Sequence, residues 1–320
     1  MIVMNTAQVN QDVLSRFSRL AGQHRLAHAY LLVGPRDSGK TQTALALAQL
    51  VNCESPEAKP CGQCPPCRKI ASGNHPDVHI LGSDDTQTIK IEEVRHLLGR
   101  VALMAFEAKQ KVFILRNIET MTTDAANAFL KTLEEPAPNT LMVLTTSLPE
   151  ANLDTIKSRC HIVKFFPSPV NRVAHVLAEE GLKDADARFL ALYAEGCLGQ
   201  ARKLRDQEIF RQRRKILDEM LLNRYNDTFL KELVTDRQAT AQALQLLLSF
   251  FRDVLLLKNG TPASELLNQD FLKEVEKFAG RSSEDLGQIV GQIVETKRQV
   301  DENLNVKMSL SLLREHLWVN

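Results

Sequence analysis

The chain has 320 residues, of which 44% are hydrophobic and 25% charged, and its formal net charge is +1. At roughly 150 residues per domain, this length suggests two or three domains. A charge so close to neutral argues against a surface dedicated to nucleic acid, because affinity for DNA rests mainly on the neutralisation of phosphates. The sequence lacks both a run of about 18 apolar residues and the pattern of a signal peptide, so we expect a cytoplasmic protein without a membrane span.

The first elements in chain order surround a glycine-rich loop. Apolar residues at helical spacing predict a helix over residues 10–23, and the apolar run 28–34 predicts a buried strand that ends in glycine. A helix rich in alanine and leucine is expected from residue 41 to 53. The segment between them, GPRDSGKT, matches the phosphate-loop pattern G-x-x-x-x-G-K-[ST] through Gly34, Gly39, Lys40 and Thr41.

A phosphate loop between a strand and a helix indicates a nucleotide site. Its backbone N–H groups turn inward around phosphates, Lys40 would reach the outer phosphates, and Thr41 would offer its hydroxyl to magnesium. We therefore expect ATP or ADP, with Mg²⁺, at this loop. The plainer alternative is a relic loop that binds no nucleotide.

Four cysteines follow in residues 53–67, separated by seven, two and two residues. Cys-x-x-Cys turns supply paired thiolates, and four thiolates can enclose one tetrahedral zinc ion with no open position for catalysis. Two disulfides or free thiols are the alternative, which a reducing cytosol disfavours. We therefore predict a structural Zn²⁺ site made by Cys53, Cys61, Cys64 and Cys67.

Strands and helices continue to alternate up to residue 166. The sequence predicts an extended piece at 77–81, a helix from Ile91 to about Ala105, strands at 111–115 and 140–146, and a helix at 124–135. This alternation is typical of a parallel sheet covered by helices on both faces. The first domain is therefore expected to be an α/β domain over residues 1–166.

The remainder of the chain is expected to be helical. Two prolines within residues 165–171 mark the domain boundary, and no strand is predicted after it. We expect a small helical domain over 167–206 and a second all-α domain over 207–320. The segment 243–257 is apolar nearly all round, which indicates a helix at the centre of a bundle.

Several segments together resemble bacterial clamp-loader subunits, which are AAA+ proteins of the DNA polymerase III holoenzyme. They are HAYLLVGPRDSGKT, the insert with CGQCPPC, HPD at 75–77, NAFLKTLEEP at 127–136 and SRC at 158–160. The resemblance is close over about the first 165 residues. It implies an AAA+ domain, a helical lid and a helical collar in a pentameric ring with gamma/tau and delta subunits. Such a ring loads the sliding clamp, and it meets primed DNA as an assembled complex.

Four features favour the delta-prime branch of this family over the ATPase motor branch, gamma/tau. Arg116 and Asn117 stand where the motor's strand ends in an Asp-Glu pair. The motor's lid pattern GSLRDA is GCLGQA here, with Gly199 at the place of the sensor arginine. HPD follows the insert directly, and the chain ends after the collar. The resemblance therefore implies a structural ring member with weak or no ATPase activity of its own.

The same resemblance gives roles to two further residues. Arg159, in SRC, would be an arginine finger offered in trans to ATP on a neighbouring motor subunit, where a guanidinium stabilises charge on the transferred phosphate. On residue chemistry alone, such an arginine is most often part of a surface ion pair. Thr146 aligns with the first sensor position, a role that needs an acidic partner.

Two other functions stay open at this point. A self-sufficient ATPase motor needs an acid for magnesium, and the candidates are Glu119, Glu134 and Glu135. The alternation of a strand is expected to turn Glu119 away, and the other two end a helix before a proline. An AAA+ protein that binds DNA by itself is disfavoured by the near-neutral charge.

Overall fold

The computed structural model describes residues 9–56, 59–82, 88–151, 154–207, 209–222, 227–302 and 306–318. The chain divides into two compact units. The first comprises Met1–Ser168 with Cys197–Gln200, and the second comprises Pro169–Gly196 with Ala201–Asn320. The expected lid (167–206) and collar (207–320) fall mainly within the second unit, and their separation from each other stays a prediction.

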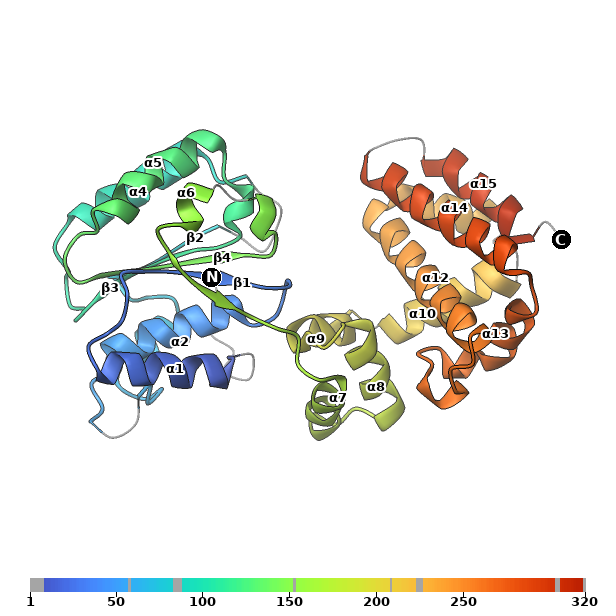
Figure 1. Ribbon diagram of the computed structural model, residues 1–320, viewed down its shortest axis with the longest axis horizontal. Helices are drawn as coiled ribbons and strands as arrows, with labels where there is room; N and C mark the ends of the chain where they lie inside the picture. The colour runs from blue at the N-terminus through green and yellow to red at the C-terminus, as the bar shows by residue number, and fades with distance from the viewer. Residues whose placement is uncertain are drawn as a thin grey trace. The chain divides into compact units, whose positions relative to one another are not determined.

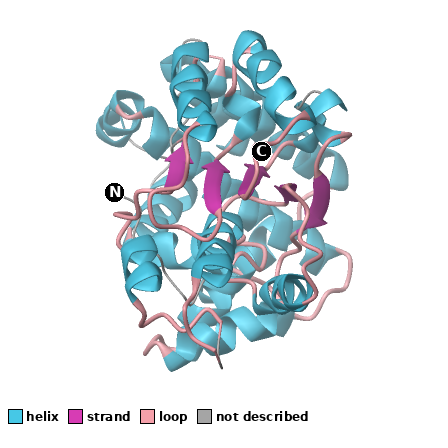
Figure 2. Cartoon of the chain, turned by 90° about the vertical axis from the view of Figure 1, so that its left-hand side faces the viewer, coloured by secondary structure: helices cyan, strands magenta, loops and turns pink. Residues whose placement is uncertain are grey.

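Five parallel strands form the sheet of the first unit (Figure 1). They are β1 Ala29–Val33, β2 Val78–Leu81, β3 Lys111–Leu115, β4 Thr140–Thr146 and β5 His161–Lys164, in the order β2-β3-β4-β1-β5. β1 lies between β4 and β5, with Tyr30 opposite both Val143 and His161. Figure 2 shows the strands as a layer between helices. The α/β AAA+ fold expected from the sequence is confirmed.

Two hydrophobic cores lie on the two faces of this sheet. Helices α1 Gln11–Gly22, α2 Lys40–Asn52 and α3 Pro65–Ala71 cover one face, and α4 Ile91–Ala102, α5 Thr123–Glu134 and α6 Asp154–Lys157 cover the other. Along β3, Val112 and Ile114 point toward α2, whereas Phe113 and Leu115 point toward α4 and α5. Burial of one such side chain stabilises the fold by about 1.5–3 kcal/mol, so the alternation determines which face each residue of β3 takes.

Two elements differ from the sequence predictions. Helix α4 ends at Ala102, three residues early, because the buried ammonium of Lys111 donates to the carbonyl oxygens of Val101, at 2.6 Å, and Leu103. Strand β5 was not predicted, since most of its residues are exposed and it begins and ends with the polar His161 and Lys164. The other predicted elements of the first unit are confirmed, with ends shifted by at most one residue.

The second unit is helical in all of its described elements. They are α7 Val170–Glu179, α8 Asp184–Tyr193, α9 Leu198–Asp206, α10 Ile209–Leu217, α11 Asp227–Thr235, α12 Arg237–Lys258, α13 Leu272–Ala279, α14 Ser283–Asp301 and α15 Val306–Trp318, of which α9 begins in the first unit. Residues 239–258 of α12 are long and apolar enough to cross a membrane, but 56% of that window is buried. Phe250 and Phe251 pack edge-on against Phe278, with ring centroids 5.7 and 5.3 Å apart, so the predicted central helix is confirmed.

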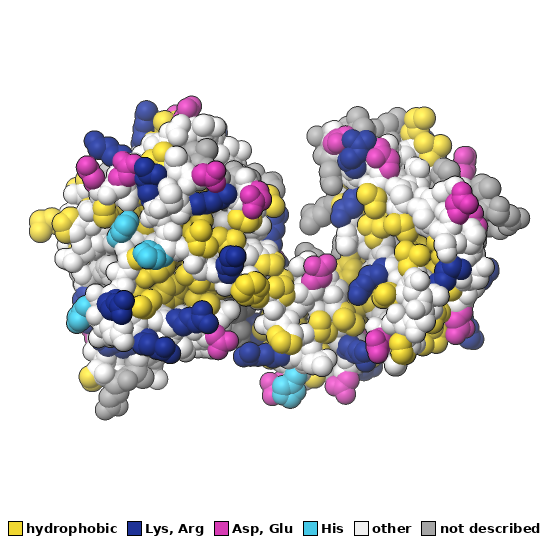
Figure 3. Space-filling view, in the orientation of Figure 1, with side chains coloured by type: hydrophobic (Ala, Val, Ile, Leu, Met, Phe, Trp, Pro, Cys, Tyr) yellow, Lys and Arg dark blue, Asp and Glu magenta, His cyan; other side chains and the backbone are white. Residues whose placement is uncertain are grey.

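The exposed surface mixes charges with apolar side chains. On the face drawn in Figure 3, basic and acidic side chains are interspersed in both units, in keeping with the net charge of +1. In the first unit, Met104 and Phe106 are 95% and 84% exposed in the loop between α4 and β3. A loop that exposes apolar side chains needs polar contacts to hold its backbone.

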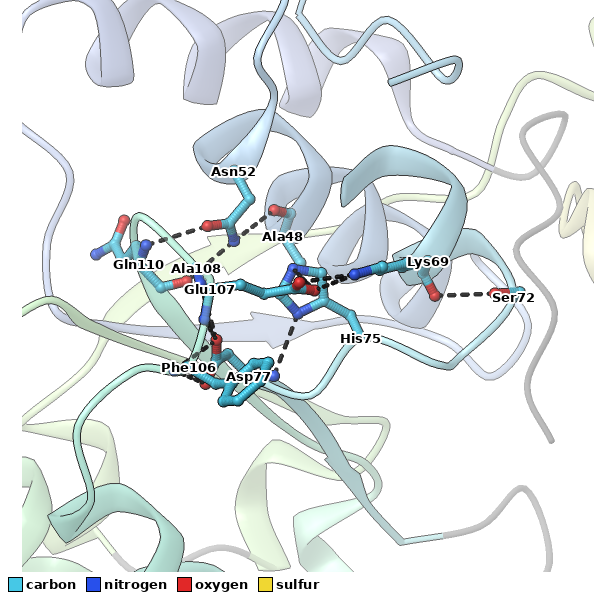
Figure 4. Close-up of polar contacts among 10 residues, drawn as sticks. All are labelled: Ala48, Asn52, Lys69, Ser72, His75, Asp77, Phe106, Glu107, Ala108 and Gln110. Carbon is cyan, nitrogen blue, oxygen red and sulfur yellow. Dashed lines mark hydrogen bonds and ion pairs between the residues drawn. The ribbon is translucent and has the colours of Figure 1, made fainter. Parts of the chain in front are cut away.

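A buried network around HPD holds that loop (Figure 4). The carboxylate of Asp77 accepts the backbone N–H groups of Phe106, Glu107 and Ala108 at 2.7–3.0 Å. His75 Nδ1 accepts the N–H of Asp77 at 3.2 Å, and its Nε2 lies 3.7 Å from the Glu107 carboxylate. Burial acts to raise the pKa of Asp77, but the three N–H donors outweigh it and hold this pKa below its ordinary value.

We expect Asp77→Asn to lower the free energy of unfolding of the first unit by about 1–3 kcal/mol, because a neutral amide binds three N–H donors less well than a carboxylate. Since the folded-state pKa is lowered, the carboxylate's contribution is present above the unfolded pKa of about 3.9 and is lost as the pH falls through the folded value. Urea unfolding at neutral and acidic pH measures both effects. Asp154→Asn, at a carboxylate with a side chain 97% exposed, is the control. Equal losses for the two variants would contradict the prediction.

Candidate functional site

The phosphate loop joins the carboxyl end of β1 to the N-terminus of α2. The N–H of Gly34 donates to the carbonyl of Thr146 at 3.2 Å, and a Cβ atom at Gly34 would lie 2.4 Å from the carbonyl oxygen of Phe165. Gly39 precedes α2 with a φ of 86°, in the left-handed region that favours glycine. Both glycines are therefore required by the backbone itself.

Lys40 directs its ammonium group into this loop. Its Nζ donates to the carbonyl oxygens of Gly34, at 2.7 Å, and Pro35, and the residue is 6% exposed. Burial lowers the pKa of Lys40 to about 8, and the charges of Glu119 and Asp37 oppose that shift. A buried cation at a helix N-terminus suits an anion, so the loop fits the phosphates of a nucleotide.

The residues after β3 do not fit magnesium in the same way. Arg116 is 3% exposed, and its N–H donates to the carbonyl of Leu81 at 2.8 Å. Asn117 has a φ of 51°, and its N–H donates to Thr145 Oγ1 at 3.1 Å. Mg²⁺ is bound mainly through carboxylate oxygens and phosphates. A guanidinium and an amide therefore occupy the positions where such a site needs acids.

Glu119 lies close enough to the phosphate loop for its charge to act on Lys40, although the sequence placed it after a strand whose alternation was expected to turn it away. The strand ends at Leu115, and a 3-10 helix over Ile118–Thr120 redirects the chain, so the expectation that alternation turns Glu119 away is wrong. Its Oε1 accepts from the N–H and the hydroxyl of Ser147 at 3.1 and 2.6 Å, and Thr146 also donates to the carboxylate. The residue at the sensor position thus has an acidic partner, which sequence reasoning missed.

Gly199 lies against the tip of the loop. The segment Cys197–Gln200 groups with the first unit, and a Cβ atom at Gly199 would lie 2.6 Å from the carbonyl oxygen of Asp37. A side chain there requires the loop backbone to move. Gly199 therefore allows an approach to the loop that an arginine in this position would prevent.

Arg159 lies at the opposite edge of the sheet. It precedes β5, which runs parallel to β1, whereas the phosphate loop follows β1. Five residues at about 3.3 Å each put roughly 16 Å between the two edges. The guanidinium donates from Nε to Glu134 Oε1 at 2.9 Å and from a terminal nitrogen to the carbonyl of Thr155 at 2.9 Å. Glu134 is thus at the wrong edge to serve magnesium at the chain's own loop, and Glu135 follows it directly.

The four predicted cysteines meet in one cluster. Their sulfur atoms all lie within 4.8 Å of one another, close to the separation of about 3.8 Å that four Zn–S bonds of about 2.3 Å produce. The N–H groups of Cys64 and Gln63 donate to Cys61 Sγ at 3.3 and 3.4 Å and lower the pKa of Cys61 to about 6, whereas burial raises the pKa of Cys67. The cluster can hold a metal ion such as zinc.

We expect Gly199→Ala to lower the melting temperature of the first unit by a few degrees. The helix propensity of alanine is better by about 1 kcal/mol, but the contact with the Asp37 backbone forces a shift that costs about 1–3 kcal/mol. Gly99→Ala, in α4 with open space around the new Cβ atom, is the matched control and should raise the melting temperature. Equal stabilisation by both substitutions in thermal unfolding would show that the loop does not resist a side chain at Gly199.

Known proteins match both parts of the chain. A family described as "DNA polymerase III, delta subunit" matches residues 9–169, and one described as "DNA polymerase III, delta subunit, C terminal" matches residues 207–317. The DNA polymerase III subunit delta' of Bacillus subtilis is 32% identical over 303 residues, which are 92% of this chain and 90% of that protein. The delta' subunit of Pseudomonas aeruginosa is 36% identical over 209 residues, 63% of each chain.

A tau subunit is also similar over part of its length. The DNA polymerase III subunit tau of Escherichia coli is 34% identical over 206 residues, which are 62% of this chain and 32% of tau. The delta' subunit of B. subtilis, in contrast, matches nearly end to end. The chain therefore belongs to the family of DNA polymerase III delta' subunits, clamp-loader proteins related to gamma/tau.

Proposed function

We propose that this chain is a structural member of the clamp-loader ring that gives Arg159 to ATP on a neighbouring gamma/tau subunit. The observation that carries the proposal is the separation of Arg159 from the chain's own phosphate loop by the length of β1. An arginine finger acts on the transferred phosphate at hydrogen-bond distance. Arg159 can therefore serve a nucleotide only on another subunit.

The ion pair with Glu134 supports this role. The side chain of Arg159 is 32% exposed and that of Glu134 is 49% exposed, and such pairs contribute about 1 kcal/mol or less. The planar guanidinium can bind two phosphate oxygens as it binds a carboxylate. Exchange of Glu134 for a phosphate therefore costs little, and the pair holds the guanidinium in one orientation until then.

The second candidate function is an ATPase motor that uses its own loop. Glu119 favours it, because its carboxylate bonds to Thr146 and its charge acts on Lys40. Against it, the Oε1 atom of Glu119 already accepts two hydrogen bonds from Ser147, and Arg116 stands in the place of the usual acid. Weak or absent hydrolysis by the isolated chain is the expectation that follows.

The remaining parts of the proposal concern the assembled loader. The gamma/tau and delta subunits are the proposed neighbours in a pentameric ring, through which the chain meets the sliding clamp and primed DNA in the cytoplasm. Zn²⁺ is the proposed metal of the cysteine cluster, with a structural role, because four sulfur ligands leave no open position for a substrate.

We expect Arg159→Ala to slow hydrolysis about 10³-fold or more at the one ATP site that this subunit serves. The DNA-stimulated ATP hydrolysis of the whole reconstituted loader should then fall by the amount that this site contributes. Arg159→Lys should lose nearly as much, since an ammonium lacks the forked donors. Glu134→Gln removes the same ion pair and keeps the guanidinium, so it is the matched control. Full hydrolysis by the Arg159→Ala loader would refute the finger.

For the cysteine cluster, we expect one zinc ion per chain in freshly purified, reduced protein. Cys64→Ser and Cys67→Ser should lose most of the metal and lower the melting temperature, because metal binding stabilises the folded state. Cys160→Ser, at a half-buried cysteine outside the cluster, should keep both. Elemental analysis and thermal unfolding make these measurements, and a metal content near zero in the unmutated protein counts against the site.

A further inference from the structure

We propose that the phosphate loop of this chain binds the phosphates of a nucleoside di- or triphosphate without a divalent cation, with the guanidinium of Arg116 supplying the positive charge that magnesium supplies in a motor subunit. The inference rests on the nucleotide binding expected of the loop. It goes beyond the expectation of weak or absent hydrolysis, because it gives Arg116 a role in binding the nucleotide.

The side chain of Arg116 lies on the same face of the sheet as the loop and its helix. Val112 and Ile114 pack into the core that contains α2, and the backbone of Arg116 continues the pairing with β2 through its bond to Leu81. The period of two therefore puts Arg116 on the α2 face at the carboxyl edge. At 3% exposed, its side chain runs inside the protein.

The negative charge of Asp37, in the loop, acts on two buried cations. Burial lowers the pKa of Arg116 and of Lys40, and in both cases the negative charge of Asp37 opposes the shift. Asp37 has a φ of 56° and lies in the loop itself. Its charge is therefore near both cations. A phosphate oxygen carries the same sign of charge and can replace this carboxylate as their common partner.

Magnesium finds no matching set of ligands here. Thr41 offers one hydroxyl, while the two positions that would offer carboxylates hold Arg116 and Asn117. Of the two acids near the loop, Glu119 already accepts hydrogen bonds from Ser147 and Thr146, and the charge of Asp37 already acts on Lys40 and Arg116. A cation brought to this side of the loop would meet a guanidinium of like charge. The site therefore favours phosphates whose charge the protein neutralises directly.

The test is the affinity of the purified full-length chain for ADP and ATP, by calorimetry, in excess Mg²⁺ and in excess EDTA. We expect dissociation constants within about threefold of each other in the two conditions. Arg116→Ala should weaken binding in EDTA by about tenfold or more. Arg116→Lys, which keeps a charge, should weaken it less. Lys40→Ala should abolish binding in both conditions, and Arg100→Ala, on the exposed face of α4, should leave it unchanged.

Three outcomes would overturn the inference. They are binding by the unmutated chain in Mg²⁺ alone, an affinity of Arg116→Ala in EDTA equal to the unmutated chain's, and no nucleotide binding in either condition. Thermal unfolding of each variant shows whether it is folded, and Arg116→Lys keeps the test valid where Arg116→Ala is unstable. The role of Arg159 is measured in the assembled loader, so its failure and the failure of this inference are separate results.

Discussion

The common direction of the strands is the constraint on which the chemistry of the first unit depends. In a parallel sheet, the loops that follow strands gather at the carboxyl edge, where ligands bind in open α/β sheets. The phosphate loop, Arg116 and Thr146 lie at that edge. The segments that precede strands gather at the other edge, where Glu134 holds Arg159. One chain can thus carry part of a nucleotide site at one edge and a residue for a neighbour's site at the other.

Electrostatics at the carboxyl edge explain how a phosphate loop can bind phosphates without an acidic residue at position 116. Two unit charges about 4 Å apart interact by about 4 kcal/mol at an effective dielectric constant near 20, and a divalent ion doubles this. An arginine beside a magnesium position therefore costs several kcal/mol of metal affinity. The same arginine attracts phosphate oxygens. In the proposed binding mode, Arg116 therefore supplies a direct anion-binding site at the position where a metal-binding site needs an acid, and Lys40 and the glycines of the loop keep their roles.

The sequence predicted the elements whose signal is local. Apolar periodicity predicted the strands before and after the phosphate loop, and fixed spacing predicted the loop and the cysteine cluster. The structure contains the strands and the loop, and it brings the four cysteines together. Strand β5 escaped prediction because an exposed edge strand has no apolar alternation. Glu119 was misjudged because Asn117, in a left-handed conformation, breaks the strand pattern. The contact of Gly199 with Asp37 joins segments about 160 residues apart, and no local pattern indicates it.

Two of the positions at which the resemblance sets this chain apart from the motor branch, Arg116 and Gly199, act on the same residue of the loop. Arg116 acts on Asp37 through charge, and Gly199 acts on it through the close approach of two backbones. An acid at position 116 would lie within reach of the negative charge of Asp37, which would oppose its ionisation. An arginine restored at position 199 would require the backbone of Asp37 to move. Because both residues act on Asp37, a change at either position is expected to alter the phosphate loop, and the effects of the two changes are not expected to be independent.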